Sequence, residues 1–232
     1  MTGTKRVPPT LVREYVGTVL HDASYHFFSR SNIFLYPRAV IERDVVADFP
    51  RVAGAKVSRQ SFFSHELLVA ITERAPYALW CLPAHAGQVG GDEGACFEMD
   101  DGGFIFAEAS GVHEAFSEYI FLGGLVTDSP IGQTFAATHL PSLVALLTGL
   151  GQAGFSPSGA SVESATDFTI PLGNDFVLKA PFGANSDTLI KNLQLVLSSD
   201  TLTGKRGQLE YVDLRFGDRV YYKLKGEEQH SQ

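Results

Sequence analysis

Residues 207–225, GQLEYVDLRFGDRVYYKLK, constrain the fold more than any other stretch because apolar and polar residues alternate in two successive runs. The runs cover residues 211–216 and 219–225, and alternation with a period of two predicts strands that each bury one face. Gly217 and Asp218 between them form a two-residue turn of the kind that tolerates positive φ. The chain is therefore predicted to close on a β-hairpin, with a polar tail over residues 226–232.

The second strand of this hairpin carries the pair Tyr221-Tyr222, and we expect it to lie at the edge of a sheet. An edge strand presents unpaired N–H and C=O groups, which can pair with a strand of another chain. The hairpin therefore favours a binding protein over an enzyme.

The acidic composition limits the classes of partner. The chain has 232 residues and a formal charge of −8, and it contains no Lys/Arg-rich block. A nucleic-acid backbone or an anionic membrane surface would be repelled, so neither is expected as the main partner. No apolar run reaches the ~18 residues that cross a bilayer, and residues 1–9 lack the apolar centre of a signal peptide.

The first third of the chain has the predicted order helix, helix, strand, strand. Helices are expected over residues 8–21 and 37–48, each with a proline near its start and an apolar stripe. Strands are expected over residues 52–59 and 66–82.

The sequence after residue 82 predicts a mostly antiparallel sheet with two helices, so the expected fold class is α+β. A Gly-rich loop is expected over residues 84–94 and a hairpin over 96–110, turning at Asp100-Asp101-Gly102-Gly103. The other expected elements are strands over 118–123, 161–166, 167–172 and 176–180, helices over 141–150 and 186–199, and the closing hairpin.

Two motifs resemble the bacterial cell-division family FtsQ/DivIB. The first is YVDLRFGDRVYYK at the C-terminus, and the second is FPRVAGAKVSRQ followed by LLVAITERAPYALW. The resemblance implies a POTRA-like module over residues 1–80, whose first strand is missing and whose sheet edge is therefore unpaired. It also implies an FtsQ-type β domain over residues 81–225.

The resemblance further implies a non-enzymatic scaffold of the division machinery that binds small bitopic proteins of the FtsB/DivIC and FtsL type. In that family the partner adds as a strand beside the last strand, and the matching positions here are Phe216, Val220 and Tyr222, next to Tyr221. The chain would lie on the extracytoplasmic side of the plasma membrane, behind an upstream anchor helix and β-strand. The alternatives are a POTRA-containing chaperone of another envelope system and an unrecognised hydrolase.

Two cysteines, Cys81 and Cys96, flank the Gly-rich loop. They can be two small buried apolar residues or a disulfide that closes the loop. An extracytoplasmic location favours the disulfide. With His85 as the one histidine nearby, they are too few for a zinc site.

No other pattern predicts chemistry, so no catalytic residue, cofactor or metal is expected. Gly149, Gly151 and Gly154 spell G-x-G-x-x-G, but a helix precedes them, so they are interpreted as a helix C-cap and loop. The histidines are scattered, and no G-x-S-x-G elbow is present.

Four charged residues on the predicted strands have no assigned role. Asp213 and Arg215 share one strand face, where they form either a functional ion pair or a partly exposed structural one. Glu73 and Arg74 are expected to be solvated or to contact the other domain.

Overall fold

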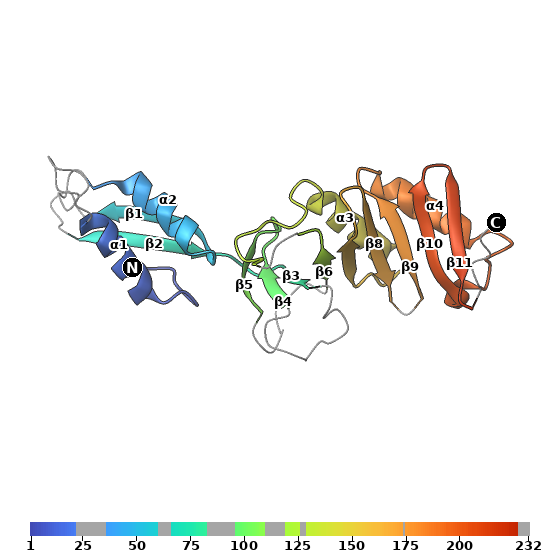
Figure 1. The fold of residues 1–232 in the computed structure, drawn as a ribbon, viewed down its shortest axis with the longest axis horizontal. Helices are drawn as coiled ribbons and strands as arrows, with labels where there is room; N and C mark the ends of the chain where they lie inside the picture. Colours follow the sequence, from blue (N-terminus) through green and yellow to red (C-terminus); the bar gives the residue numbers. More distant parts are fainter. Residues whose placement is uncertain are drawn as a thin grey trace. The chain divides into compact units, whose positions relative to one another are not determined.

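The computed structural model confirms an α+β protein and divides the chain into two compact units, Met1–Ala75 and Pro76–Gln232 (Figure 1). Its described part contains four α-helices and a mixed, mostly antiparallel sheet of nine strands. The structure describes residues 1–21, 36–59, 66–82, 96–109, 119–125, 129–173 and 175–226. The predicted loop over 84–94 and the tail beyond residue 226 lie outside these ranges.

The first unit consists of α1 (Pro9–His21), α2 (Arg38–Asp48) and the antiparallel pair β1 (Val52–Arg59) and β2 (Leu67–Glu73), in the predicted order. Its core is aliphatic, because both helices place β-branched residues on the stripe that faces the strands. The buried residues are Val7, Val12, Val16, Ile41, Val45, Val52, Val57, Val69 and Ile71.

The edge of β2 that was expected to be unpaired has a short partner. Thr2 forms an isolated parallel bridge with Ala70. The N–H of Thr2 donates to the carbonyl of Val69 at 3.1 Å, and the N–H of Ile71 donates to the carbonyl of Thr2 at 3.0 Å. The first residues of the chain therefore occupy the position of a third strand for the length of one bridge.

Glu73 was expected to be solvated or to contact the other domain, but its carboxylate is bonded to the backbone of its own unit. Its carboxylate accepts hydrogen bonds from the N–H groups of Lys5, Arg6 at 3.0 Å and Val7 at 2.9 Å. These donors precede α1, so the end of β2 is tied to the start of that helix. Burial alone would raise the pKa of Glu73, but the three N–H bonds outweigh it and lower the pKa below its usual value.

We expect Glu73→Gln to reduce the free energy of unfolding of the first unit by about 1 kcal/mol at pH 7, since bonds to a charged acceptor are stronger than bonds to an amide. The folded-state pKa is lowered, so this stabilisation is complete above about pH 4.3 and is lost as the pH falls through the folded-state value. Urea unfolding at pH 7 and at low pH measures the difference. If Glu73→Gln lowered the free energy of unfolding by the same amount at both pH values, the stabilisation could not be assigned to the ionised carboxylate of Glu73.

The second unit is built on one sheet with the strand order β11-β10-β9-β8-β7-β6-β3-β4-β5. Three pairs are parallel, namely β3 with β6, β6 with β7 and β9 with β10, and the other pairs are antiparallel. The strands are β3 (Ala78–Cys81), β4 (Cys96–Met99), β5 (Ile105–Glu108), β6 (Ile120–Gly123), β7 (Gly159–Val162), β8 (Asp167–Leu172), β9 (Phe176–Pro181), β10 (Leu209–Phe216) and β11 (Arg219–Leu224).

Two helices of this unit, α3 (Leu140–Gln152) and α4 (Ser186–Leu197), lie behind the sheet in the view of Figure 1. Alternate residues of the strands join them in the core, and among the described residues of this unit no helix lies on the other face of β8–β10. That core includes Leu143, Leu147, Leu189 and Leu193 from the helices and Phe168, Ile170, Leu178 and Val212 from the strands.

Two predicted strands have different limits in the structure. The strand expected over residues 66–82 is divided into β2 and β3, because Pro76 has no N–H to donate to a ladder. The predicted domain boundary at residue 80 therefore falls inside β3, which belongs to the second unit. The strand expected over 161–166 ends at Val162, where the hydroxyl of Ser164 accepts the N–H bonds of Thr166 and Asp167 in a turn.

Cys81 and Cys96 are directly opposite each other on β3 and β4, and their sulfurs are bonded. Their Cα atoms are 4.1 Å apart, and 15 positions separate them in the chain. A loop of this length is stabilised by roughly 3 kcal/mol in the chain-entropy account.

In protein isolated from its native compartment without reductant, we expect iodoacetamide to add no mass at Cys81 or Cys96 after denaturation. Treatment with a reductant before alkylation should add two carbamidomethyl groups to the intact mass, one for each cysteine of the bridge. Two alkylated thiols in the unreduced sample would contradict the disulfide.

Candidate functional site

The two edges of the nine-stranded sheet differ. At one end, the start of β5 is paired on its outer side by residues 132–135: the N–H of Gly132 donates to the carbonyl of Ile105 at 2.8 Å, and the N–H of Ile105 donates to the carbonyl of Gln133 at 2.9 Å. At the other end, no strand in the described part of the chain pairs with the outer side of β11. The edge of β11 is therefore available to a further strand.

The register of the final hairpin identifies the backbone groups at this edge. The N–H of Lys225 donates to the carbonyl of Gln208 at 2.7 Å, so Lys225 faces β10. Both register shifts between the strands place the extra residue in β10, which leaves β11 regular. Because successive residues of a regular strand direct their N–H and C=O groups to opposite sides, Tyr221 also faces β10, whereas Val220 and Tyr222 face outward.

The four residues predicted to contact a partner all lie on this hairpin. Phe216 is 55% exposed, Tyr221 48% and Tyr222 39%, while Val220 is half-buried against the core. Tyr221 is paired with Asp213 and Tyr222 with Val212, so their side chains lie on opposite faces of the sheet. We call Phe216, Val220, Tyr221 and Tyr222 the docking edge.

Phe216 and Tyr221 contact each other on the face of the sheet opposite α3 and α4. Their ring centroids are 5.2 Å apart and the rings are nearly perpendicular, which is a favourable edge-to-face arrangement. The guanidinium of Arg215 lies 5.7 Å from the centroid of Phe216. The hairpin thus presents an exposed aromatic pair beside its outward backbone groups.

Asp213 and Arg215 form a bidentate pair on the same face. The carboxylate accepts from Nε of Arg215 at 2.9 Å and from Nη2 at 2.7 Å, and also from the backbone N–H of Arg215 at 3.1 Å. Burial would raise the pKa of Asp213, but these bonds and the charge of Arg215 outweigh it and hold the pKa below its usual value. Asp213 is only 5% exposed and the side chain of Arg215 25% exposed, so the pair is partly exposed through its basic member.

The hairpin region is basic although the chain as a whole is acidic. Residues 205–225 contain six Lys or Arg and three Asp or Glu, a formal charge of +3, whereas the whole chain carries −8. An approaching acidic segment is therefore attracted to this part of the surface more than to the rest.

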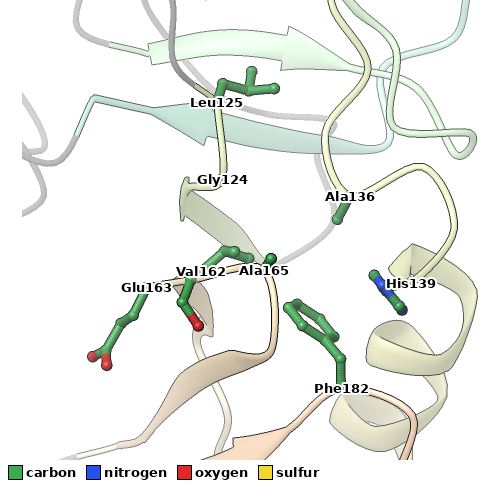
Figure 2. Close-up of a pocket in the computed structure, with 9 residues that line it drawn as sticks. Gly124, Leu125, Ala136, His139, Val162, Glu163, Ala165 and Phe182 are labelled. Carbon is green, nitrogen blue, oxygen red and sulfur yellow. The ribbon is translucent and has the colours of Figure 1, made fainter.

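A separate hollow of about 540 Å³ lies where the parallel strands β6 and β7 end, close to the start of α3 (Figure 2). The imidazole of His139 is stacked on the ring of Phe182, with centroids 4.4 Å apart. Figure 2 shows the carboxylate of Glu163 pointing away from these two rings. The lining residues are Gly124, Leu125, Ala136, His139, Val162, Glu163, Ser164, Ala165 and Phe182.

This hollow was not predicted, because its aromatic residues are far apart in the sequence and form no motif. The hydroxyl of Ser164 is bonded to Thr166 at 3.1 Å and to Asp167 at 3.3 Å, and its structural role is to close the turn after β7. No hydrogen bond joins Ser164 to His139 among the residues the structure describes. The lining is suited to an apolar group rather than to an anion, because it includes no Lys or Arg.

Gly149 and Gly151 of the G-x-G-x-x-G pattern lie in the last turn of α3 and Gly154 follows its C-cap, Ala153, so the interpretation as a helix end and loop is correct for Gly154 alone. Gly154 has a φ of 83°, and the N–H of Phe155 donates to the carbonyl of Leu150 at 3.0 Å. A Cβ at Gly149 would lie 2.6 Å from Cδ1 of Ile190, so this glycine allows α4 to pack closely on α3. Within the described ranges, no three His, Cys, Asp or Glu side chains converge on a metal position.

Across its described residues, the chain has no helix that is long and apolar enough to cross a membrane. No protein-family model matches the chain, and a search of curated proteins finds no significant match.

Proposed function

We propose that this chain is a non-enzymatic scaffold of the bacterial division machinery that binds small bitopic proteins of the FtsB/DivIC and FtsL type. The observation that carries the proposal is the asymmetry of the sheet, in which residues 132–135 pair with the start of the β5 edge while β11 has no such partner strand among the described residues. The motif YVDLRFGDRVYYK, which resembles the closing segment of the FtsQ/DivIB family, occupies this same hairpin.

Strand addition to β11 explains how the binding would work. The outward N–H and C=O groups of Val220 and Tyr222 pair with the backbone of an incoming strand, and that pairing supplies affinity irrespective of sequence. The exposed rings of Phe216 and Tyr221 lie on one face of the incoming strand, and Tyr222 lies on the other. Alternate side chains of the partner therefore meet different surfaces, which supplies specificity.

The first unit fits a POTRA-like module in this proposal. Its helix-helix-strand-strand order and the parallel bridge of Thr2 beside β2 support the comparison. The Cys81–Cys96 disulfide supports an extracytoplasmic location, because disulfides persist in oxidising compartments. Anchorage by an upstream helix in the plasma membrane completes the proposal.

The test is direct binding of the purified chain to synthetic peptides. The peptides cover the membrane-distal segments of the FtsB/DivIC-type and FtsL-type proteins of the same organism, and calorimetry measures affinity and stoichiometry. We expect saturable one-to-one binding of at least one peptide, with amide NMR shifts concentrated in β11, and no binding of a scrambled peptide of equal charge. Absence of binding by both peptides to the folded chain would overturn the proposal.

A further inference from the structure

The hairpin contains a β-bulge next to the docking edge. Between the pairs Asp213–Tyr221 and Phe216–Arg219, two residues of β10 lie opposite one residue of β11. The extra residue interrupts the alternation of side chains, so Arg215 and Phe216 lie on the same face. The contacts of Asp213 with Arg215 and of Phe216 with Tyr221 are on that face.

A hairpin without this bulge is a close alternative for the same sequence. If the strands paired without the bulge beyond Asp213 and Tyr221, Arg215 would lie opposite Arg219. Phe216 would then belong to a three-residue turn. Side-chain alternation would then direct Phe216 away from the face of Tyr221. The like charges of Arg215 and Arg219 would also be directly opposite each other, which is unfavourable.

The hydrogen bonds of the Asp213 side chain favour the bulged register over the alternative. Its Oδ1 accepts the backbone N–H of Arg215, a donor within the bulge, while both oxygens hold the guanidinium of the same residue. The carboxylate thus satisfies the backbone of the extra residue and fixes its side chain. In the described part of the chain, no other side chain accepts a hydrogen bond from the backbone N–H of Arg215.

We infer that Asp213 is a positioning residue that holds the bulge of β10 and thereby places Phe216 against Tyr221 on the docking edge. The consequence for partner binding rests on the proposed function. The consequence for the register of the hairpin does not, so the two can fail separately.

The test replaces Asp213 and reads the register by NMR in the unbound chain. In Asp213→Ala we expect the cross-strand contact of Phe216 with Arg219 and the ring contact of Phe216 with Tyr221 to be lost from the major state. New contacts of Arg215 with Arg219 should appear. Asp213→Val, a change that suits a buried strand position, is the second variant and answers the question if Asp213→Ala does not fold.

Three further variants separate positioning from a general loss of stability. Arg215→Ala keeps the backbone N–H bond to Asp213 and should keep the register, and Asp213→Asn keeps an oxygen acceptor and should do the same. Glu210→Ala is the matched control: it removes the 2.7 Å ion pair with Lys223 at the other bulge of the same strand and should leave Phe216 in place.

Partner affinity gives the last readout. If the register shifts in Asp213→Ala and affinity falls at least tenfold, with affinity restored in Asp213→Asn, both proposals are supported. If the register shifts and affinity does not change, the positioning role stands and the docking edge is wrong. If the contacts of Phe216 with Arg219 and Tyr221 persist in Asp213→Ala or Asp213→Val, the inference is overturned.

Discussion

Tyr222→Ala will bind the partner segment at least about tenfold more weakly than the unsubstituted chain, because aromatic anchors in interfaces contribute ~2 kcal/mol or more each. Tyr222 is 39% exposed on an edge strand, so the substitution leaves no large cavity in the core. Calorimetry with the same peptide measures the change, and circular dichroism monitors the fold.

Tyr222→Pro separates the backbone contribution from that of the ring. Proline lacks the N–H that Tyr222 directs away from β10, so this variant should bind more weakly than Tyr222→Ala while the hairpin still forms. Proline at Tyr221 is not a suitable alternative, because that N–H faces β10 and its loss would break the hairpin itself.

The matched control for both variants is Leu195→Ala, an exposed apolar residue on α4 whose replacement should not alter affinity. Unchanged affinity in folded Tyr222→Ala and Tyr222→Pro would exclude β11 as the binding site. The first unit would then be the next part of the chain to examine.

Phe121→Ala will lower the free energy of unfolding of the second unit by about 3–5 kcal/mol, the usual cost of removing a fully buried aromatic ring. Phe121 lies on β6 with no exposed surface, and its ring centroid is 5.2 Å from that of Phe135. The surrounding strands are hydrogen-bonded on both sides, so the cavity cannot close by a small local movement.

The single tryptophan makes this measurement specific to one unit. Trp80 is buried on β3, and its indole N–H donates to the carbonyl of Gly123 at 3.0 Å, so its fluorescence reports the second unit. Denaturant unfolding should show a large shift for Phe121→Ala and a change within about 0.5 kcal/mol for Leu195→Ala. A shift of similar size in both variants would mean that Phe121 is not central to the core.

Local patterns were sufficient to predict most of the helices and strands. The alternation over residues 211–225 predicted β10, its turn and β11, and β1 has the limits that the sequence indicated. The G-x-G-x-x-G pattern was interpreted as a helix end because a helix precedes it, and α3 does end there. These features depend on residues close in the sequence, where periodicity and turn chemistry are informative.

Features that join distant residues were not predictable in this way. Glu73 was expected to be solvated or to contact the other domain, yet its carboxylate accepts hydrogen bonds from N–H groups 66 to 68 positions away in its own unit. The hollow beside α3 depends on the stacking of His139 and Phe182. The β10 bulge was not predicted for a different reason. A period-two pattern indicates which face of a strand each side chain occupies, but not the residue at which the register with the next strand shifts by one.

The cover that residues 132–135 provide on β5 also sets a limit on assembly. A sheet with two open edges can grow from both, and such growth is the route to fibres. Residues 132–135 occupy the start of the β5 edge, so β11 is the edge strand that each chain offers for strand addition at this sheet. Recruitment through β11 would consequently place one partner strand in direct contact with each chain, so the number of directly bound partners is set by the number of chains present.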